Sequence, residues 1–427
     1  MFSAKHFLNN TLRAHPRGQA AAQILAQAFN AAEPGAAVKK YLHENPLPHE
    51  KRIFAFGLGK ASCAMMNALA DEIPLADSLV ITKHASPLIV EPVTVIEGDH
   101  PIPGIGSLHA GTAAIKFLSQ LAQDDLLVCL ISGGGSALMT SPRVPLEDLQ
   151  ALTSALLACG ARIDEINTLR RHLDKLKGGG MAGLANGAQV ISLLLSDVVG
   201  DSLEAIASGP TVPDPATLAD SISIIEKYNL RNNIPATIIP ALTETLKPND
   251  PIFEKVQNKI IASNSIALQA AKTQAELLGF QARILNSNLQ GEANIVGKEL
   301  SLQLKESLRT MQRPFCLLAG GEVTVTIKGN GKGGRNQQLA LAAVDKLAGL
   351  QNVLLVSIAT DGEDGPTDAA GAFATGGTAQ RAESLGLNAA DYLLNNDAYS
   401  FFEKIDQLMK TGPSGTNVND LILCFAF

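Results

Sequence analysis

The chain has 427 residues, which is too long for one small core and predicts two or three domains. Its 46% hydrophobic and 18% charged residues describe an ordinary globular protein. A net charge of −7 and an aromatic content of 4% disfavour nucleic-acid binding, which needs basic surfaces and stacking side chains.

Five cysteines are present, an odd number without a CxxC pair, and four of them lie inside apolar runs. Such cysteines are expected to be buried and reduced, which favours a cytoplasmic location. No apolar run approaches the roughly 20 residues that a membrane helix needs, so no membrane partner is expected.

Short apolar runs that read as strands alternate with helical segments along the chain. The predicted strands begin at Arg52, Ser78, Val93, Leu126, Val190, Lys259, Ala282, Phe315, Val323, Val353 and Leu421. Several are apolar throughout, as strands are when helices cover both faces of a parallel sheet. The alternation predicts an α/β fold. Prolines and polar residues between 211 and 250 predict a boundary near residue 240, giving domains 1–240 and 241–427, although the last strand could return to the first domain.

The stretch "FAFGLGKAS" follows a predicted strand and opens a helix. A dinucleotide fingerprint requires a third glycine where Ser62 stands and an acid near Lys83, and a P-loop requires glycine where Phe54 stands. Both motifs fail. Lys60 remains at a helix N-terminus, where its amine adds a full charge to the ~+0.5 of the helix. A solvated lysine on a first turn is the open alternative.

The next glycine loop, "SGGGS", ends the strand predicted from Leu126. Glycine permits close approach of the backbone to a ligand, and the serine hydroxyls and helix N–H groups suit a carboxylate or phosphate. A purely structural glycine run is the alternative. The loop consists of Ser132, Gly133, Gly134, Gly135 and Ser136.

A basic segment then reads as a helix from Glu165 that ends at the glycines of residues 178–180. Most of its cations are expected on a solvated face; they are Arg170, Arg171, Lys175 and Lys177. Further on, Asp197 ends an apolar strand and is a candidate metal ligand or base.

The second half adds a loop, "KGNGKGG", followed by Arg335 at a helix start. Its backbone N–H groups and the arginine are expected to stabilise charge on a phosphoryl group. Glu322 follows an apolar strand. Another strand ends in an acidic turn that begins with Asp361; it fits no calcium loop, and a magnesium site and a solvated loop remain equally open.

One lysine, one arginine, several carboxylates and two glycine loops are the parts that phosphoryl transfer requires. The sequence contains no GxSxG motif and no histidine pair with zinc spacing. His100, in "GDHPIPG", is isolated and reads as a turn or core histidine.

Nine motifs, in order from Phe54 to Leu421, resemble the glycerate 2-kinase family, a class once named hydroxypyruvate reductases of tartrate degradation. They are "GLGKAS", "GDHPIPG", "LISGGGSAL", "INTLRRHLDKLKGGGMA", "LLLSDVVGD", "IASGPTVPDP", "AGGEVTVTIKGNGKGGRNQQLAL", "ATDGEDGPTDAAGA" and "TGPSGTNVNDL". The resemblance covers nearly the whole chain. Gln338 stands where many members have glutamate.

The resemblance implies a Rossmann-like N-terminal domain with a parallel sheet, a smaller leucine-rich α/β C-terminal domain and an active site in the cleft between them. It implies transfer of the γ-phosphoryl group of ATP to the 2-hydroxyl of D-glycerate, with Mg²⁺. Lys60, Asp197 and Arg335 match the family's catalytic lysine, aspartate and arginine.

The remaining site residues are hypotheses built on both kinds of reasoning. We expect the SGGGS loop to hold substrate carboxylate or phosphate, and Asp197 and Asp361 to bind Mg²⁺. Residues expected to bind the nucleotide are Gly331, Gly333, Gly334 and Glu322. The partner is then a small molecule, D-glycerate, and a homo-oligomer is possible. The alternatives are an NAD(P)H-dependent hydroxypyruvate reductase and a non-catalytic sugar-acid binding protein.

Overall fold

The computed structural model describes residues 1–48 and 50–427. The chain folds into two compact units, each with its own six-stranded sheet. The Rossmann-like unit is Pro34–Ile261, and the mixed-sheet unit combines Met1–Glu33 with Ala262–Phe427. The boundary expected near residue 240 therefore falls inside the Rossmann-like unit, and the first 33 residues belong with the C-terminal half of the chain.

The sheet of the Rossmann-like unit has the strand order β3-β2-β1-β4-β5-β6. The neighbours from β3 to β5 pair in parallel, which confirms the predicted Rossmann-like sheet. The strands are β1 (Ile53–Leu58), β2 (Asp77–Thr82), β3 (Thr94–Glu97), β4 (Leu126–Ile131), β5 (Gln189–Leu195) and β6 (Val256–Ala262). Every residue of β1 and β4 is buried, as their continuous apolar runs predicted. Because the strand order reverses between β1 and β4, their carboxyl ends form a switch point where ligands bind in such sheets.

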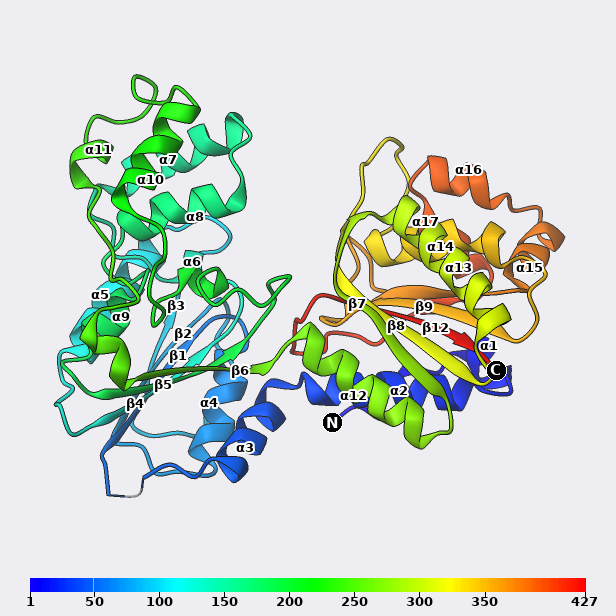
Figure 1. Ribbon diagram of the computed structural model, residues 1–427, viewed down its shortest axis with the longest axis horizontal. Helices are drawn as coiled ribbons and strands as arrows, with labels where there is room; N and C mark the ends of the chain where they lie inside the picture. Colours follow the sequence, from blue (N-terminus) through cyan, green and yellow to red (C-terminus); the bar gives the residue numbers. More distant parts are fainter. Residues whose placement is uncertain (49) are drawn as a thin grey trace. The chain divides into compact units, whose positions relative to one another are not determined.

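Helices cover both faces of this sheet (Figure 1). Four of them form a separate helical layer with its own apolar cluster beyond the sheet: α7 (Leu146–Ala158), α8 (Ile163–His172), α10 (Leu218–Lys227) and α11 (Ile238–Ala241). The other helices and turns are α3 (Pro34–Glu44), α4 (Ser62–Ala70), α5 (Ile105–Leu118), α6 (Gly135–Leu138), α9 (Gly180–Gly183), η2 (Ile206–Ser208) and η3 (Pro251–Lys255).

Helix α8 ends at His172, six residues before the glycines that were expected to stop it. The cause is Asp174, whose carboxylate accepts a hydrogen bond from the Leu176 N–H at 2.8 Å and contacts Lys177 Nζ at 2.6 Å. The prediction that the cations of this segment are solvated was also wrong for two of them. Arg171 and Lys177 are 5% and 4% exposed and pair with Asp214 and Asp174.

The mixed-sheet unit has the strand order β11-β10-β9-β12-β8-β7. Its strands are β7 (Gln281–Glu292), β8 (Phe315–Thr324), β9 (Val353–Ala359), β10 (Gly371–Thr375), β11 (Leu408–Met409) and β12 (Asp420–Ala426). β7 and β8 are parallel, whereas β12 runs antiparallel to both β8 and β9. The last strand therefore stays in this unit. The two strands predicted around residues 315–328 are one, β8, and the stretch after Thr324 is irregular.

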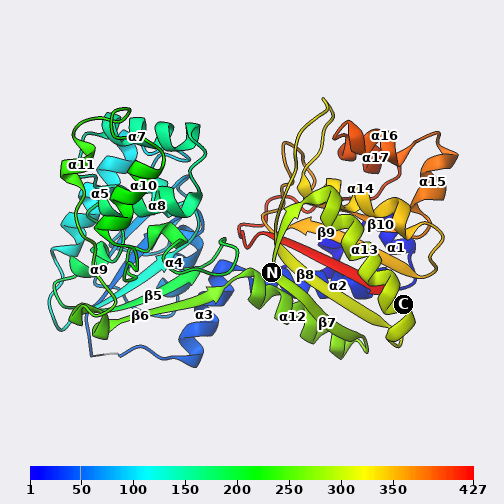
Figure 2. The same ribbon diagram turned by 45° about the horizontal axis from the view of Figure 1, so that its top comes forward.

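The N-terminal segment completes this unit. Helix α2 (Gly18–Ala31) lies beside α12 (Asn264–Leu277) in both views (Figures 1 and 2). The Asn9 amide donates to the carbonyls of Asp406 and Leu408 at 2.9 and 3.2 Å, which ties the start of the chain to β11. The other helices are η1 (Ala4–Phe7), α1 (Asn10–Ala14), α13 (Ala293–Thr310), α14 (Arg335–Leu347), α15 (Thr378–Ser384), α16 (Ala389–Leu394) and α17 (Ala398–Lys404).

Within residues 1–48 and 50–427, no helix is both long and apolar enough to cross a membrane. All five cysteines are free thiols, and four of them are buried, as the sequence predicted; the exposed one is Cys159.

Candidate functional site

The loops after β1 and β4 are fastened to each other at the switch point. The Ala61 N–H donates to Ser132 Oγ at 3.0 Å, and the Lys60 N–H donates to the Gly133 carbonyl at 3.1 Å. Gly59 has a φ of +117°, and a Cβ there would overlap the Ser132 carbonyl. Glycine is thus required where the loops meet. The Lys60 side chain is exposed, with no ion pair or side-chain hydrogen bond to the described residues.

Asp197 joins this loop pair from the end of β5. A Cβ on Gly133 would overlap Asp197 Oδ2, and one on Gly134 would lie 3.4 Å from Lys60 Cε. Lys60 and Asp197 therefore flank the same two glycines. The structure brings together the predicted lysine, glycine loop and aspartate of this unit, from the carboxyl ends of three neighbouring strands.

The SGGGS loop is less open than its sequence suggests. Ser132 is 1% exposed, and its hydroxyl accepts the Ala61 N–H. Gly135 is buried, and a Cβ there would lie 2.8 Å from the Ala207 Cβ. Gly134 and Ser136 are half-buried, so these two members can meet a ligand.

A strained turn lies against Ser136. Its hydroxyl is 2.7 Å from that of Ser208. Ala207, Ser208 and Gly209 all have positive φ values, of 50°, 61° and 60°. For the two non-glycine residues this conformation costs roughly 1–2 kcal/mol each, and such strain gathers at functional sites.

His100 is a site residue that sequence reasoning set aside. Its ring atoms lie 3.2 and 3.4 Å from a Cβ built on Gly134, next to Lys60 Cε. Burial lowers the pKa of His100, and the charges of Lys60 and Lys83 lower it further, so the imidazole is neutral near pH 7. A signal was present: "GDHPIPG" follows the third parallel strand, at the same sheet edge as the two glycine loops.

The second group of predicted residues surrounds the start of α14. Arg335 Nη1 lies 2.6 Å from Glu322 Oε1, and its Nε lies 2.8 Å from Asp420 Oδ2. Its Nη2 donates to Asp420 Oδ1 at 3.1 Å. The Arg335 side chain is 29% exposed, and it is held between the exposed carboxylate of Glu322 and the fully buried carboxylate of Asp420.

A protein carboxylate already occupies the N-terminus of α14. Asp364 Oδ1 accepts the N–H of Asn336 at 3.0 Å, and its Oδ2 accepts that of Gln337 at 2.8 Å. Burial raises the pKa of Asp364 to about 6 against these hydrogen bonds. Burial also raises the pKa of Asp420 to about 7, although the Arg335 charge opposes it. Both carboxyls are therefore close to titrating at neutral pH.

In the glycine loop before Arg335, the N–H groups of residues 328–332 are already bonded within the protein. The N–H groups of Lys328 and Gly329 donate to Asn396 Oδ1 at 2.8 and 3.0 Å, and that of Gly331 donates to the Asn395 carbonyl at 2.9 Å. Side-chain oxygens of Asn395 and Asp397 accept the next two, from residues 330 and 332. These donors bind a neighbouring turn of the protein.

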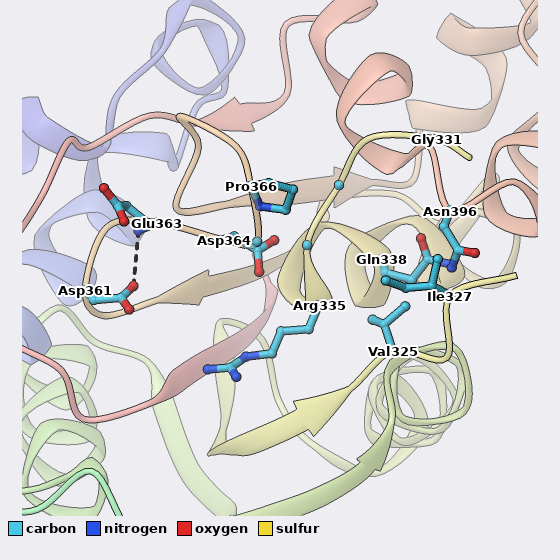
Figure 3. A pocket seen from close by; sticks show the side chains of 13 residues that line it. Val325, Ile327, Gly331, Arg335, Gln338, Asp361, Glu363, Asp364, Pro366 and Asn396 are labelled. Atoms are coloured by element: carbon cyan, nitrogen blue, oxygen red, sulfur yellow. Dashed lines mark hydrogen bonds between the residues drawn. The ribbon is translucent and has the colours of Figure 1, made fainter. Parts of the chain in front are cut away.

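A pocket of ≈ 480 Å³ opens beside this loop (Figure 3). Val325, Ile327 and Asn396 lie together on one side of it, and Asp361 and Glu363 lie on the other. The pocket is also lined by Gly331, Gly333, Gly334 and Arg335. Glu322 does not line it but forms an ion pair with Arg335.

The two carboxylates expected to hold metal are those of Asp197 and Asp361. Asp361 is half-buried and accepts the Glu363 N–H at 3.1 Å. No group of three histidine, cysteine, aspartate or glutamate side chains suited to a metal occurs in the described part of the chain. Mg²⁺ needs only one or two protein carboxylates when substrate phosphates and water complete its shell, so Asp197 and Asp361 remain compatible with it.

The protein thus combines a Rossmann-type unit, with an exposed lysine at its switch point, and a second α/β unit, with a pocket that Arg335 lines. Two known families match it: that described as "Domain of unknown function (DUF4147)" matches residues 20–243, and the MOFRL family matches residues 315–420.

Relatives of known name cover almost the whole chain, and the chain belongs to the glycerate kinase family. It is 38% identical to the glycerate 2-kinase of Pyrococcus horikoshii over 94% of this chain and 95% of that one. It is also 38% identical to the D-glycerate 2-kinase of Thermotoga maritima, over 94% and 97%. The crystal structure of a Thermotoga maritima glycerate kinase superposes with a TM-score of 0.90, covering 96% of this chain and 99% of that one.

Proposed function

We propose that this protein transfers the γ-phosphoryl group of ATP to the 2-hydroxyl of D-glycerate, giving 2-phosphoglycerate. The observation that carries the proposal is the 38% identity to two glycerate 2-kinases over 94% of the chain. The site geometry supports it independently, because Lys60 follows β1 at the switch point and Arg335 opens α14 beside a pocket, so each unit offers a cation to an anionic ligand.

The Rossmann-like unit is the proposed acceptor site. Lys60 has no counterion among the described residues, so its charge is available to an anion. Asp197, which lies against Gly133, is proposed either to orient the 2-hydroxyl or to bind Mg²⁺. Neutral His100 beside Lys60 adds a hydrogen-bonding group without adding charge.

The mixed-sheet unit is the proposed nucleotide site. Its ≈ 480 Å³ pocket falls within the 300–1,000 Å³ typical of ligand pockets. Val325, Ile327 and Pro366 supply apolar surface for a base, and Arg335 supplies the cation for the phosphates. Glu322 and Asp420 fix the orientation of the guanidinium in advance, and such preorganised charge is what stabilises a transferring phosphoryl group.

Mg²⁺ would neutralise charge on the phosphoryl oxygens during transfer. Asp197 and Asp361 are the proposed protein ligands, one in each unit, and nucleotide phosphates would complete the coordination. The proposal requires Lys60 and Arg335 to act on one triphosphate. This requirement, and the expected cleft between the domains, stay predictions.

The test is identification of the product. Incubating the protein with ATP, Mg²⁺ and D-glycerate should give a ³¹P NMR signal of 2-phosphoglycerate, and EDTA should abolish it. Formation of 3-phosphoglycerate would overturn the regiochemistry, and absence of any ATP turnover would overturn the kinase assignment. A parallel assay with NADH and hydroxypyruvate tests the reductase alternative. Lys83 stands where the acid that binds the ribose of a dinucleotide would be expected, so no oxidation of NADH is expected.

A further inference from the structure

One cation near the proposed acceptor site has no role so far. Arg170 lies in the last turn of α8, and its side chain is half-buried. Within the described residues, no carboxylate lies within ion-pair distance of its guanidinium, and no hydrogen bond involves it. Its neighbour Arg171 differs, because Arg171 Nε lies 2.9 Å from Asp214 Oδ2.

Arg170 lines a small cavity that reaches the SGGGS loop. Ser136 and Thr140 supply hydroxyl groups to the same cavity, and Ile102 and Pro103 supply apolar wall from the loop that carries His100. The Gln150 amide fixes that loop by donating to the Pro103 carbonyl at 2.8 Å. The cavity and the Lys60 site thus share one short turn, because Ser136 lines the cavity and Gly134 lies against Lys60.

Among the charged groups that line the cavity, one positive charge has no negative partner. Asp174 and Lys177 also line it, but they neutralise each other through a contact of 2.6 Å. Asp174 is further committed to the Thr140 hydroxyl at 2.6 Å and the Leu176 N–H at 2.8 Å. Arg170 therefore faces the cavity with its charge uncompensated. Burial lowers the pKa of Arg170, which is the expected sign of a partly desolvated cation without a partner.

We propose that Arg170 binds the carboxylate of the acceptor, and so selects hydroxy acids over neutral alcohols. The inference rests on the proposed function and names the group that recognises the acid. Guanidinium and carboxylate are matched for a bidentate pair. In D-glycerate the carboxylate and the 2-hydroxyl are borne by adjacent carbons, so their oxygen atoms are ~3 Å apart. An acid held by Arg170 and Ser136 would present its hydroxyl towards Lys60 and Asp197.

The size of the cavity separates this ligand from the nucleotide. It measures ≈ 20 Å³, against ≈ 480 Å³ for the pocket beside Arg335. So small a cavity takes only a small group. A carboxylate head group fits that description and a triphosphate does not.

The test is equilibrium binding by calorimetry, without ATP. D-glycerate, glycolate, glycerol and inorganic phosphate are titrated into the wild-type protein, Arg170→Met and Arg162→Met. Arg162 is a matched control, since it flanks the same helix, is exposed and pairs with Asp164 at 2.7 Å. We expect the wild type to bind both carboxylates and not glycerol. Arg170→Met should weaken carboxylate binding roughly 10- to 100-fold, the range for hydrogen bonds to a charged group, and Arg162→Met should leave it unchanged.

A second measurement separates recognition from a structural role. Because Arg170 makes no bond to the described residues, Arg170→Met should keep or raise Tm, whereas Arg171→Met should lower Tm by leaving buried Asp214 unpaired. Arg170→Gln serves as a second variant if Arg170→Met does not fold. In turnover assays, KM for D-glycerate should rise while KM for ATP stays constant.

Each contrary result has a distinct meaning. Equal carboxylate affinity in the wild type and Arg170→Met overturns the role of Arg170, as does a wild type that binds neither carboxylate. Inorganic phosphate binding more tightly than glycolate, and lost in Arg170→Met, overturns its assignment to a carboxylate. A wild type that binds D-glycerate through Arg170 yet forms no phosphorylated product overturns the proposed function and leaves the recognition of the acid standing.

Discussion

The two glycine loops look alike in sequence and owe their glycines to different causes. Gly133 leaves room for Asp197, a charged group of the proposed acceptor site. Gly329 and Gly331 leave room for the backbone of Asn395, because a Cβ on either would crowd its carbonyl oxygen. The first loop is thus shaped around chemistry and the second around packing. A glycine-rich stretch indicates close approach and does not say whether a ligand or the protein approaches.

The two cations differ in the same way. Lys60 is exposed and has no ion pair among the described residues, so its charge is available to a substrate. Arg335 is held between Glu322 and the buried Asp420, so its charge is largely compensated and its geometry is fixed. We therefore expect Lys60 to contribute to catalysis alone, and Arg335 to contribute both to catalysis and to the stability of the fold.

The largest effect is expected at Lys60. Lys60→Met should lower kcat roughly 10³-fold, the size of effect that a cation on a transferring phosphoryl group produces. Tm should not change, because the side chain makes no contact that folding depends on. Lys116→Met, an exposed lysine on α5, is the control and should turn over like the wild type. Turnover of Lys60→Met within tenfold of the wild type would remove Lys60 from the mechanism.

Arg335→Met should lower both activity and stability. We expect kcat to fall roughly 10²-fold, as for loss of one preorganised donor. Breaking a buried pair costs about 3–5 kcal/mol, and the cost here should be near the lower end, since Asp420 can take up a proton. Denaturant unfolding and steady-state kinetics measure the two effects. Arg309→Met removes an exposed pair with Glu306 and should change neither. An unchanged stability would contradict the role assigned to the ion pairs.

The glycine comparison can be broken by a pair of alanine variants. Gly133→Ala forces Asp197 to move, and a displacement near 1 Å at a reacting group costs roughly 10- to 100-fold in kcat. Gly331→Ala brings a methyl group against the Asp397 Cβ and should cost roughly 1–3 kcal/mol of stability. Each variant is the control for the other. If the two variants changed kcat and Tm in the same way, the two loops would not differ as the geometry indicates.

The alternation of apolar runs with helical segments was enough to predict an α/β fold with a parallel sheet, whereas the Rossmann-like domain was implied by the family resemblance. Strands such as β1 and β4 are buried at every residue, as expected for apolar runs in a parallel sheet covered on both faces. The sequence also located Lys60 and Asp197 just after strands, and Arg335 at the start of a helix. It did not locate β10 and β11, because "GAFAT" and "LM" are too short to show a period.

Side-chain partners could not be predicted, because they depend on contacts distant in sequence. Arg335 and Asp420 are 85 residues apart, and nothing local links them. The same holds for Asn396, whose side chain takes the N–H groups of a loop nearly 70 residues earlier. The position of His100 after the third strand was a signal that it shares the sheet edge of the glycine loops, but the contact of its ring with Gly134 is visible only in the structure.

The smallest expected effect concerns pH and the two buried carboxyls behind Arg335. Their folded-state pKa values are raised, to about 6 for Asp364 and about 7 for Asp420. The folded protein therefore holds more protons than the unfolded chain between about pH 4 and 7. The stability that these groups contribute is full below about pH 4 and is lost as the pH rises through 6 and 7.

Asp420→Asn isolates this contribution, because the amide cannot ionise. The variant should gain stability relative to the wild type as the pH rises from 5 to 8, with a slope of at most ~1.4 kcal/mol per pH unit. Unfolding midpoints in urea at pH 5, 6, 7 and 8 measure it. Taking the difference between the two proteins cancels groups such as Glu165, whose pKa is lowered to about 2 by its hydrogen bond with Lys227. Parallel midpoints across the four pH values would show that Asp420 stays ionised, held by Arg335 despite its burial.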